Sequence, residues 1–519
     1  MGELGKGRCR DQIKLSVFFS RKVIEYVFLW VIIKYVMKKQ SEWSCLSCEI
    51  SMEWGMDTGF LHKNRIASVL RYGKDPFCYG SVKRFCFRLR QQICVAVLFA
   101  LLLVSAPVYA GIVDSGELTE PSFWILNNNA GDSVVLEEEE IRQFNRKICN
   151  MSLDVTEMKS LPDAIPVKEF LPWITNTWAM RGTVFRNGKL LTEREKEAIQ
   201  NNLNLAALPG ENETATVQYG VTVRHAMVRN LPLADGLFDE PEDVYYDNVQ
   251  DSVLEAGEPV AILHESLDKK YYYVRLYNLF GWIAREDIAA CTREQWLKYA
   301  DPQDFLVVTG RDYYTRVNGE DVFHLMGAKL QLLQEKKNRW QVLLPYKDSK
   351  TGQLKEKQTW LAKEENLHRG YLPYTTDQVL QQAFRFYGSV YGWGGVMRSV
   401  DCSSLVGSVY RTMGLDLPRN TSKLVKMPGG VTDFTGMNRE ERLQALAKLK
   451  PGSPLSMKGH IMIYLGMEGG VPYVIHSSSS YYKEGRKVYV RRVLVSDLEM
   501  DRKNGKSFLE NIVNGITYR

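Results

Sequence analysis

Cysteine is scarce over most of this 519-residue chain. Six of its nine cysteines precede residue 110, and only Cys149, Cys291 and Cys402 follow. Three widely separated thiols cannot form the disulfide framework of a small secreted domain. Cys149 and Cys291 stand among apolar residues, which indicates small hydrophobic side chains in a core. Cys402 needs another explanation.

An excess of basic charge is also missing from most of the chain. The formal net charge of +6 arises in residues 1–110, which hold 17 Lys and Arg against 8 Asp and Glu. Residues 111–519 hold 50 Lys and Arg against 53 Asp and Glu, so this part of the chain is slightly acidic. A nucleic-acid-binding protein needs a basic face, so we expect no nucleic-acid partner. The 45% hydrophobic and 25% charged residues exclude a disordered chain, and the length predicts several domains.

Long apolar runs are rare, and the clearest spans residues 93–104. Four basic residues precede this run, and a small-x-small pattern, Val108-Tyr109-Ala110, follows it. These features predict a cleavable signal peptide over residues 82–110 and export to the periplasm or the extracellular cell envelope. An uncleaved anchor is the alternative, because no charge occurs between Gln91 and Val113, which is about the length of a membrane span. Pro107 and its small neighbours favour cleavage, so we expect no stable membrane anchor.

Residues 1–81 stand before this signal, although an export signal normally opens the chain. We interpret them as a leader that is untranslated or not native. Their apolar stretch from Leu15 to Met37 contains four charged residues, which makes it a poor membrane span. Cys45 and Cys48 have the spacing of a metal or redox pair, but no second pair accompanies them.

The part of the chain after the signal divides into several predicted units. Residues 111–213 mix helical and connecting patterns and predict an N-terminal stabilising segment. Residues 214–290 alternate β-branched and aromatic residues between turns, which predicts a small β-barrel. A similar series over residues 304–370 ends in Thr359-Trp360-Leu361-Ala362, which matches Gly281-Trp282-Ile283-Ala284, and forms an internal repeat. The two units resemble paired bacterial SH3-like barrels.

Residues 374–519 mix α and β patterns, and Cys402 opens a helix there. Along VDCSSLVGSVYRTMG, Leu405 and Val409 mark the apolar face of this helix and Gly414 its end. Free N–H groups and the positive end of the helix dipole meet in a first turn, and both favour thiolate over thiol. Such a position can lower the pKa of a cysteine from ~8.5 into the range of ~3.5 to 7.5, and the same N–H groups can bind an oxyanion. The sequence thus predicts a nucleophile.

Two of the seven histidines accompany this cysteine. His460 and His476 end short apolar runs that predict neighbouring strands, with residues 466–470 as the hairpin loop. In that register Leu465 faces Val471, and the two histidines face each other with Cβ atoms ~4.5 to 5.5 Å apart. One imidazole can then orient the other, as the base for a nucleophilic cysteine requires. The alternatives are ordinary structural histidines or a metal site; no carboxylate or further cysteine has ligand spacing near them, so we expect no metal.

The order of these residues resembles the NlpC-type cysteine peptidases of bacterial cell walls. The shared stretches are YGWGG at 391–395, DCSSL at 401–405, LKPGSPL at 449–455, GHIMIYLG at 459–466 and IH at 475–476. The resemblance implies a multidomain protein with an α+β, papain-like cysteine peptidase domain over its C-terminal unit. The two barrels and the N-terminal segment resemble the variety that carries SH3-like domains and an N-terminal stabilising domain.

The resemblance also implies catalytic roles. Cys402 would be the nucleophile, His460 the general base, and His476 the third, polar residue that holds His460. The family needs no cofactor for this chemistry.

Three further residues receive a substrate-binding role from the resemblance. Tyr391 would lie beside the nucleophile, and Asp401 and Ser403 would bind the free amine of the substrate. A carboxylate can give an ammonium group a charge-assisted hydrogen bond, which fits this role. The sequence departs from the family at Ser453, where an acidic residue is usual, and this departure concerns the local turn.

The family's substrate is the peptidoglycan stem peptide, cut between γ-D-glutamate and the following diamino acid, as in L-Ala-γ-D-Glu-diaminopimelate. The resemblance implies a monomeric hydrolase whose partners are stem peptides or muropeptides. Two alternatives stay open, a non-catalytic wall-binding protein and an acyltransferase on the same fold. Residues 233–252, an acidic and aromatic loop in the first barrel, could be a solvated insertion or a wall of the substrate cleft.

Overall fold

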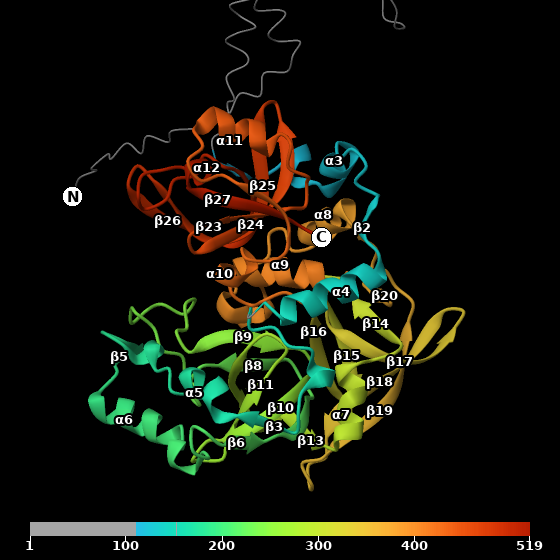
Figure 1. Cartoon of the computed structure of the whole chain (residues 1–519), viewed down its shortest axis with the longest axis vertical. Helices are drawn as coiled ribbons and strands as arrows, with labels where there is room; N and C mark the ends of the chain where they lie inside the picture. Colours follow the sequence, from blue (N-terminus) through green and yellow to red (C-terminus); the bar gives the residue numbers. More distant parts are fainter. Residues whose placement is uncertain (1–110, 152) are drawn as a thin grey trace, which may run out of the picture. The chain divides into compact units, whose positions relative to one another are not determined.

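The computed structural model describes residues 111–519 except residue 152. The predicted leader and signal peptide, residues 1–81 and 82–110, lie outside the described residues. Figure 1 shows the described elements coloured along the chain, from the blue N-terminal segment to the red C-terminal strands. Within this part of the chain, no helix is both long and apolar enough to cross a membrane.

The C-terminal domain is built on a seven-stranded antiparallel sheet with the order β1-β26-β25-β24-β23-β27-β22. Its strands are β1 (Ile112–Val113), β22 (Gly429–Asp433), β23 (Pro454–Met457), β24 (His460–Glu468), β25 (Val471–Lys483), β26 (Arg486–Asp497) and β27 (Ile512–Tyr518). The central strand β24 is buried from His460 to Leu465. Its sequence is therefore a continuous apolar run, and not the alternating pattern of a sheet with one wet face.

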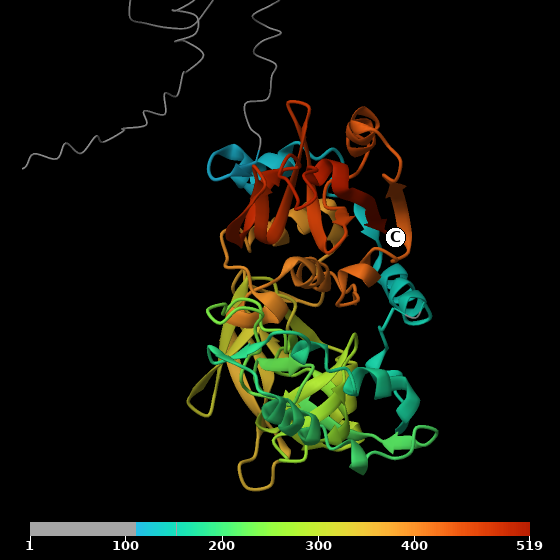
Figure 2. The same cartoon turned by 90° about the vertical axis from the view of Figure 1, so that its left-hand side faces the viewer.

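Helices cover both faces of this sheet (Figure 2). α8 (Thr376–Phe384) and α9 (Cys402–Arg411) share a core with Ile461, Ile463 and Ile475 on one face. α11 (Arg439–Leu446) and α12 (Phe508–Asn511) share a core with the residues of opposite parity on the other face. The short α10 (Thr421–Leu424) follows α9. Cys402 and His460 thus begin two elements that pack against each other.

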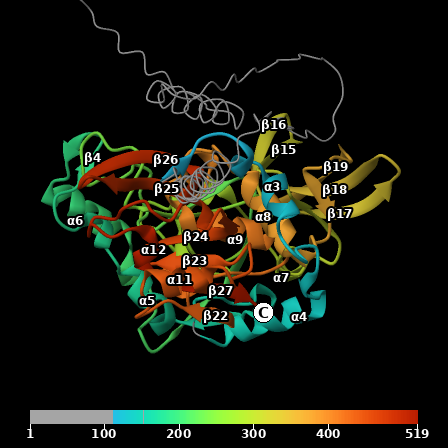
Figure 3. The same cartoon turned by 90° about the horizontal axis from the view of Figure 1, so that it is seen from above.

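The N-terminal segment binds to the C-terminal domain at several places. β1 pairs with β26, and β2 (Val134–Leu136) pairs with β21 (Tyr374–Thr375). α3 (Pro121–Leu126) lies beside α8, as Figure 3 shows from above, and Trp124 packs 5.5 Å from Tyr473. The remaining elements are α4 (Glu138–Cys149), β3 (Ala164–Pro166), α5 (Val167–Ile174), β4 (Phe185–Arg186), β5 (Lys189–Leu190), α6 (Glu193–Asn202) and β6 (Thr214–Thr216).

The first β domain contains a seven-stranded antiparallel sheet with the order β13-β7-β10-β11-β12-β8-β9. Its strands are β7 (Gln218–Thr222), β8 (Ala226–Arg229), β9 (Gln250–Leu254), β10 (Pro259–Glu265), β11 (Tyr271–Arg275), β12 (Phe280–Ala284) and β13 (Ile288–Cys291). The predicted closure into a barrel is not found in the described chain, because β9 and β13 do not pair with each other. Other domains cover these edges instead: Gln250 of β9 donates to the carbonyl of Gly394 at 2.9 Å, and the N–H of Ala290 in β13 donates to Gly352 at 3.1 Å.

The second β domain follows the helix α7 (Arg293–Ala300) and has the strand order of the first, with one hairpin detached from the sheet. It combines a five-stranded sheet, β19-β18-β17-β14-β20, with the separate hairpin β15-β16. Its strands are β14 (Phe305–Val308), β15 (Asp312–Val317), β16 (Glu320–Leu325), β17 (Lys329–Lys336), β18 (Arg339–Lys347), β19 (Leu354–Ala362) and β20 (Leu367–Arg369).

The two β domains have the same strand order. The series β13-β7-β10-β11-β12 of the first corresponds to β20-β14-β17-β18-β19 of the second, and the hairpin β8-β9 corresponds to β15-β16. Trp282 is fully buried in β12, between β11 and β8. Trp360 stands in the edge strand β19, half-buried, with the cations of Lys336 and Arg339 over its ring at 4.8 and 4.4 Å. The two tryptophans thus stand in corresponding strands. They differ in burial because β8 pairs with β12, whereas β15 does not pair with β19.

Candidate active site

Cys402 is the first residue of α9, as predicted. The Asp401 carboxylate caps this helix by accepting from the N–H of Ser404 at 2.8 Å, and the Ser404 hydroxyl accepts from the N–H of Asp401 at 2.8 Å. This reciprocal cap fixes the first turn of the helix. Cys402 is half-buried and lines a cavity of about 700 Å³, so its thiol is not enclosed in the hydrocarbon core.

His460 and His476 form a hydrogen-bonded chain with a serine. Nε2 of His460 lies 2.8 Å from Nδ1 of His476, and Nε2 of His476 lies 3.1 Å from Oγ of Ser496 in β26. The exposed fractions of His460 and His476 are 7% and 0%. The ring of Phe508 in α12 lies 5.9 Å from each imidazole ring. Three adjacent strands thus hold three polar side chains in one line.

The predicted strand register of the two histidines is wrong by two residues. β24 and β25 are joined by a two-residue turn with Glu468 opposite Val471, and a bulge at Leu465 shifts the remaining pairs. His460 therefore lies diagonally from His476 and not directly opposite. The prediction assumed a five-residue loop and an unbroken ladder. A shift of two residues keeps both side chains on the same face, because side chains alternate with a period of two, and the rings still meet.

Burial favours the neutral forms of the thiol and of both imidazoles. Burial and the Asp401 carboxylate raise the pKa of the Cys402 thiol to about 11, although the backbone N–H of Ile461 favours the thiolate. Burial lowers the pKa of His476 to about 3, and burial and His476 hold the pKa of His460 well below its usual value. Lost hydration and the neighbouring carboxylate therefore oppose the expected effect of the helix terminus on the thiol pKa.

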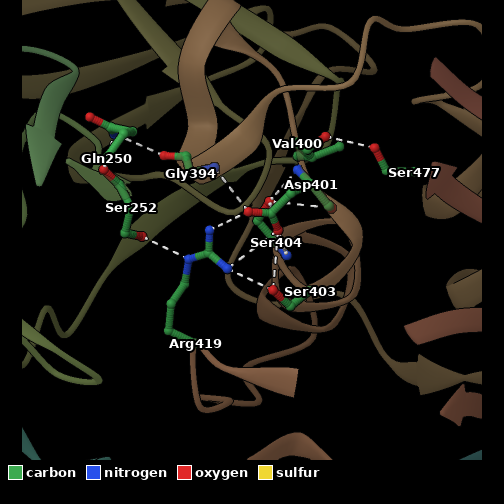
Figure 4. Close-up of polar contacts among 9 residues, drawn as sticks. All are labelled: Gln250, Ser252, Gly394, Val400, Asp401, Ser403, Ser404, Arg419 and Ser477. Atoms are coloured by element: carbon green, nitrogen blue, oxygen red, sulfur yellow. Dashed lines mark hydrogen bonds and ion pairs between the residues drawn. The ribbon is translucent and has the colours of Figure 1, made fainter. Parts of the chain in front are cut away.

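Asp401 and Ser403 already have partners for their polar atoms (Figure 4). Besides capping α9, the Asp401 carboxylate accepts from the N–H of Gly394 at 3.0 Å and forms an ion pair with Arg419. The Ser403 hydroxyl donates to Asp401 at 3.1 Å and accepts from Arg419 at 2.6 Å. Nε of Arg419 donates to the hydroxyl of Ser252 in β9 at 3.1 Å. An amine could bind Asp401 or Ser403 only if Arg419 moved away.

Tyr391 lies under a loop of the first β domain. The ring of Tyr246 lies 5.8 Å from that of Tyr391 and 5.4 Å from that of Trp393. Tyr246 belongs to residues 233–252, the acidic and aromatic loop that sequence reasoning left as either a solvated insertion or a wall. Gln250, near the end of this stretch, lines the cavity with Cys402. The end of this loop therefore forms part of the cavity wall.

The cavity has a polar end in the first β domain. There the Asp251 carboxylate accepts from Nδ2 of Asn230 at 3.1 Å, and burial raises the pKa of Asp251 to about 6. Oδ1 of Asn230 and the hydroxyl of Tyr273 are buried and have no hydrogen-bond partner in the described part of the chain. Trp173 and Trp178 of the N-terminal segment complete the lining beside them. Unsatisfied acceptors next to a carboxylate suit a ligand rich in hydrogen-bond donors.

Sequence reasoning missed these lining residues. Asp251 stands in the loop that the sequence singled out, and its neighbourhood could have been suspected. Asn230, Tyr273 and Arg419 carry no local signal, because their partners come from distant parts of the chain. In the described ranges, 111–151 and 153–519, no three His, Cys, Asp or Glu side chains lie close enough together to hold a metal ion.

Comparisons with known proteins agree with this architecture. Residues 388–496, which include Cys402, His460 and His476, match the NlpC/P60 family, and residues 236–284 match the SH3 domain of the SH3b1 type. A search of curated protein sequences gave no match.

Solved structures give the same picture. An NlpC/P60 endopeptidase from Photobacterium damselae subsp. piscicida is 19% identical over 76% of this chain and 96% of its own, with a TM-score of 0.60, which shows a shared fold. An NlpC/P60 family protein from Bacillus cereus ATCC 10987 is 18% identical over 52% of this chain and 83% of its own, with a TM-score of 0.38. NlpC2 from Trichomonas vaginalis is 13% identical over 56% of this chain and 98% of its own, with a TM-score of 0.22. The C-terminal domain of the chain thus belongs to the NlpC/P60 family, whose members are cysteine peptidases and amidases, and an SH3 domain of the SH3b1 type precedes it.

Proposed function

We propose that this protein hydrolyses peptidoglycan stem peptides between γ-D-glutamate and the following diamino acid, with Cys402 as nucleophile. The observation that carries the proposal is the 2.8 Å contact between Nε2 of His460 and Nδ1 of His476 beside the cavity that Cys402 lines. That contact leaves Nδ1 of His460 as the nitrogen free to act as a base.

The protonation pattern follows from this geometry. A base at Nδ1 of His460 carries its own proton on Nε2 and donates it to Nδ1 of His476. His476 then carries its proton on Nε2 and donates it to Ser496. When His460 becomes an imidazolium it keeps the same donor at Nε2, so neither neighbour has to rearrange.

The reaction then proceeds in two stages. His460 takes the thiol proton, the Cys402 sulfur attacks the amide carbonyl, and N–H groups at the start of α9 stabilise the oxyanion. His460 gives its proton to the leaving amine, and a thioester remains on Cys402. Water, deprotonated by His460, attacks the thioester and releases the acyl peptide and the free thiol.

We assign recognition of the substrate's free amine to Asp251, with Asn230 and Tyr273, in place of Asp401 and Ser403. The saturated hydrogen bonds of Asp401 support this choice, as do the unpartnered oxygens of Asn230 and Tyr273. An ammonium group offers three donors, which matches three oxygen atoms at one end of the cavity. Tyr391 keeps its proposed place beside the nucleophile. The predicted export of the chain is consistent with a substrate outside the cytoplasm.

The test is incubation of the protein with L-Ala-γ-D-Glu-diaminopimelate, with the products followed by mass. We expect L-Ala-D-Glu and free diaminopimelate, and no products from Cys402→Ala. Binding without turnover would favour the non-catalytic wall-binding protein. A coupled product in the presence of an added amine would favour the acyltransferase.

A further inference from the structure

A half-buried arginine stands next to the turn that leads into His460. Arg502, in the loop between β26 and α12, donates through Nη2 to the carbonyl of Lys458 at 3.1 Å. Its Cζ lies 5.9 Å from the ring of Phe508, which packs against both active-site histidines. The turn on one side and the aromatic ring on the other thus hold the guanidinium in place.

A second cation accompanies it. Lys458 is exposed, lies two residues before His460 and lines the cavity together with Cys402. Over the described residues, 111–519 without 152, neither Lys458 nor Arg502 forms an ion pair, whereas Arg419 pairs with Asp401 nearby. A partly dehydrated cation that lacks a counter-charge favours the binding of an anion.

We propose that Arg502 and Lys458 bind a carboxylate of the substrate next to the scissile bond. The inference rests on the proposed function, because the stem peptide supplies the anion. The peptide carries the α-carboxylate of D-glutamate on one side of the bond and the carboxylates of the diamino acid on the other. A guanidinium presents paired donors that match a carboxylate, and the ammonium of Lys458 adds a charge-assisted hydrogen bond.

The electrostatics of the site agree with this placement. The charge of Arg502 contributes to lowering the pKa of His460, and it interacts with Cys402. Arg502 therefore lies within electrostatic reach of both reacting groups. A carboxylate bound there would offset its positive charge and make His460 a stronger base once the substrate is in place.

The experiment compares three peptides. The first is L-Ala-γ-D-Glu-diaminopimelate, the second has the α-carboxylate of glutamate amidated, and the third has the diaminopimelate carboxylates amidated. Each is tested with the wild type, Arg502→Gln, Lys458→Gln and the matched control Lys503→Gln, an exposed lysine in the same loop. The readout is kcat/KM, and the ratio between two peptides in one variant cancels any change in the protonation of Cys402 or His460.

We expect the wild type and Lys503→Gln to favour the fully charged peptide over one amidated peptide by about 10- to 100-fold, the range for a hydrogen bond to a charged group. In Arg502→Gln this ratio should fall towards one, and Lys458→Gln should reduce it in part. The amidated peptide that the wild type discriminates against identifies which carboxylate is bound.

Two results would overturn the inference. One is equal cleavage of all three peptides by the wild type, and the other is an unchanged ratio in Arg502→Gln. Failure of the wild type to cleave any peptide would instead contradict the proposed function. In that case, calorimetry measures the binding of the three peptides to Cys402→Ala and to the double variant Cys402→Ala, Arg502→Gln. The inference is refuted if the three peptides bind to Cys402→Ala with equal affinity, if both variants bind them with equal affinity, or if no peptide binds.

Discussion

The Oγ atom of Ser496 lies 3.1 Å from Nε2 of His476, and both residues are fully buried. This hydrogen bond gives His476 a partner for the proton that it must carry on Nε2 if Nδ1 is to accept from His460. Without it, His476 could carry its proton on Nδ1 and donate towards Nε2 of His460. The proton of His460 would then move to Nδ1, where it blocks the base.

Ser496→Ala is therefore expected to lower kcat by about 2- to 10-fold, the range for one neutral hydrogen bond, while KM stays near the wild-type value. The plateau in the profile of kcat against pH should also narrow, because His460 is no longer held in one tautomer. Ser453→Ala is the matched control. It removes another buried hydroxyl, which lies directly before β23 and bonds to Thr517 of β27 at 2.8 Å. Equal kcat losses in both variants would show that Ser496 acts only through stability.

Asp251→Asn tests the assignment of the amine-binding end of the cavity. The pKa of Asp251 is raised to about 6, so the carboxylate is charged at pH 8 and loses its charge as the pH falls through 6. KM of the wild type should rise as the pH falls across this range. In Asp251→Asn, KM should be high at pH 8, by about 10-fold or more, and should no longer change near pH 6.

Asp251→Asn should weaken substrate binding but stabilise the folded protein. A carboxyl group whose pKa is raised on folding contributes stability that is complete below its unfolded pKa and is lost as the pH rises through about 6. Asp251→Asn should therefore raise Tm at pH 8 and change it little at pH 4. A higher KM together with a higher Tm would show that Asp251 contributes to binding at the expense of stability. A lower Tm at pH 8 would show that burial is not what raises the pKa of Asp251.

Arg419→Ala is expected to destabilise the protein strongly. The side chains of Asp401 and Arg419 are 6% and 11% exposed. Burial acts to raise the pKa of Asp401, but Arg419 and the N–H of Ser404 hold it below its usual range. Removing Arg419 leaves a buried charge without its partner, so the free energy of unfolding should fall by about 3 to 5 kcal/mol.

A denaturant titration of Arg419→Ala measures this loss. The matched control is Arg439→Ala, which breaks an exposed ion pair with Glu499 and should cost about 0 to 1 kcal/mol. A loss in Arg419→Ala no larger than in the control would mean that Asp401 is protonated or hydrated in the folded protein.

Local features of the sequence were sufficient to locate the start of α9. The cap Asp401, the small residues after it and the apolar spacing from Leu405 all lie within a few positions of Cys402, so short-range rules apply. The shared face of His460 and His476 was also accessible, because the period of a strand survives a register error of two residues.

The remaining features depend on long-range contacts. Arg419 donates to the Asp401 carboxylate from 18 positions away in the chain, and no pattern in the sequence predicts this pair. Asp251 reaches the cavity because β9 is an edge strand that the C-terminal domain covers. The predicted barrel closure failed for the same reason, since the strand that would have closed the sheet contacts another domain.

The contact between Tyr246 and Tyr391 yields a last prediction about substrate access. Tyr246 comes from the loop of the first β domain that forms one wall of the site, and its ring packs on Tyr391 and Trp393. Tyr246→Ala removes this packing, which for aromatic pairs contributes about 0.5 to 1.5 kcal/mol beyond buried area, and so loosens the wall. We expect KM for the short peptide to rise by about 2- to 10-fold with little change in kcat. Tyr246→Phe keeps the ring and should retain the wild-type KM, so an equal defect in both variants would assign the effect to the hydroxyl group and not to the wall.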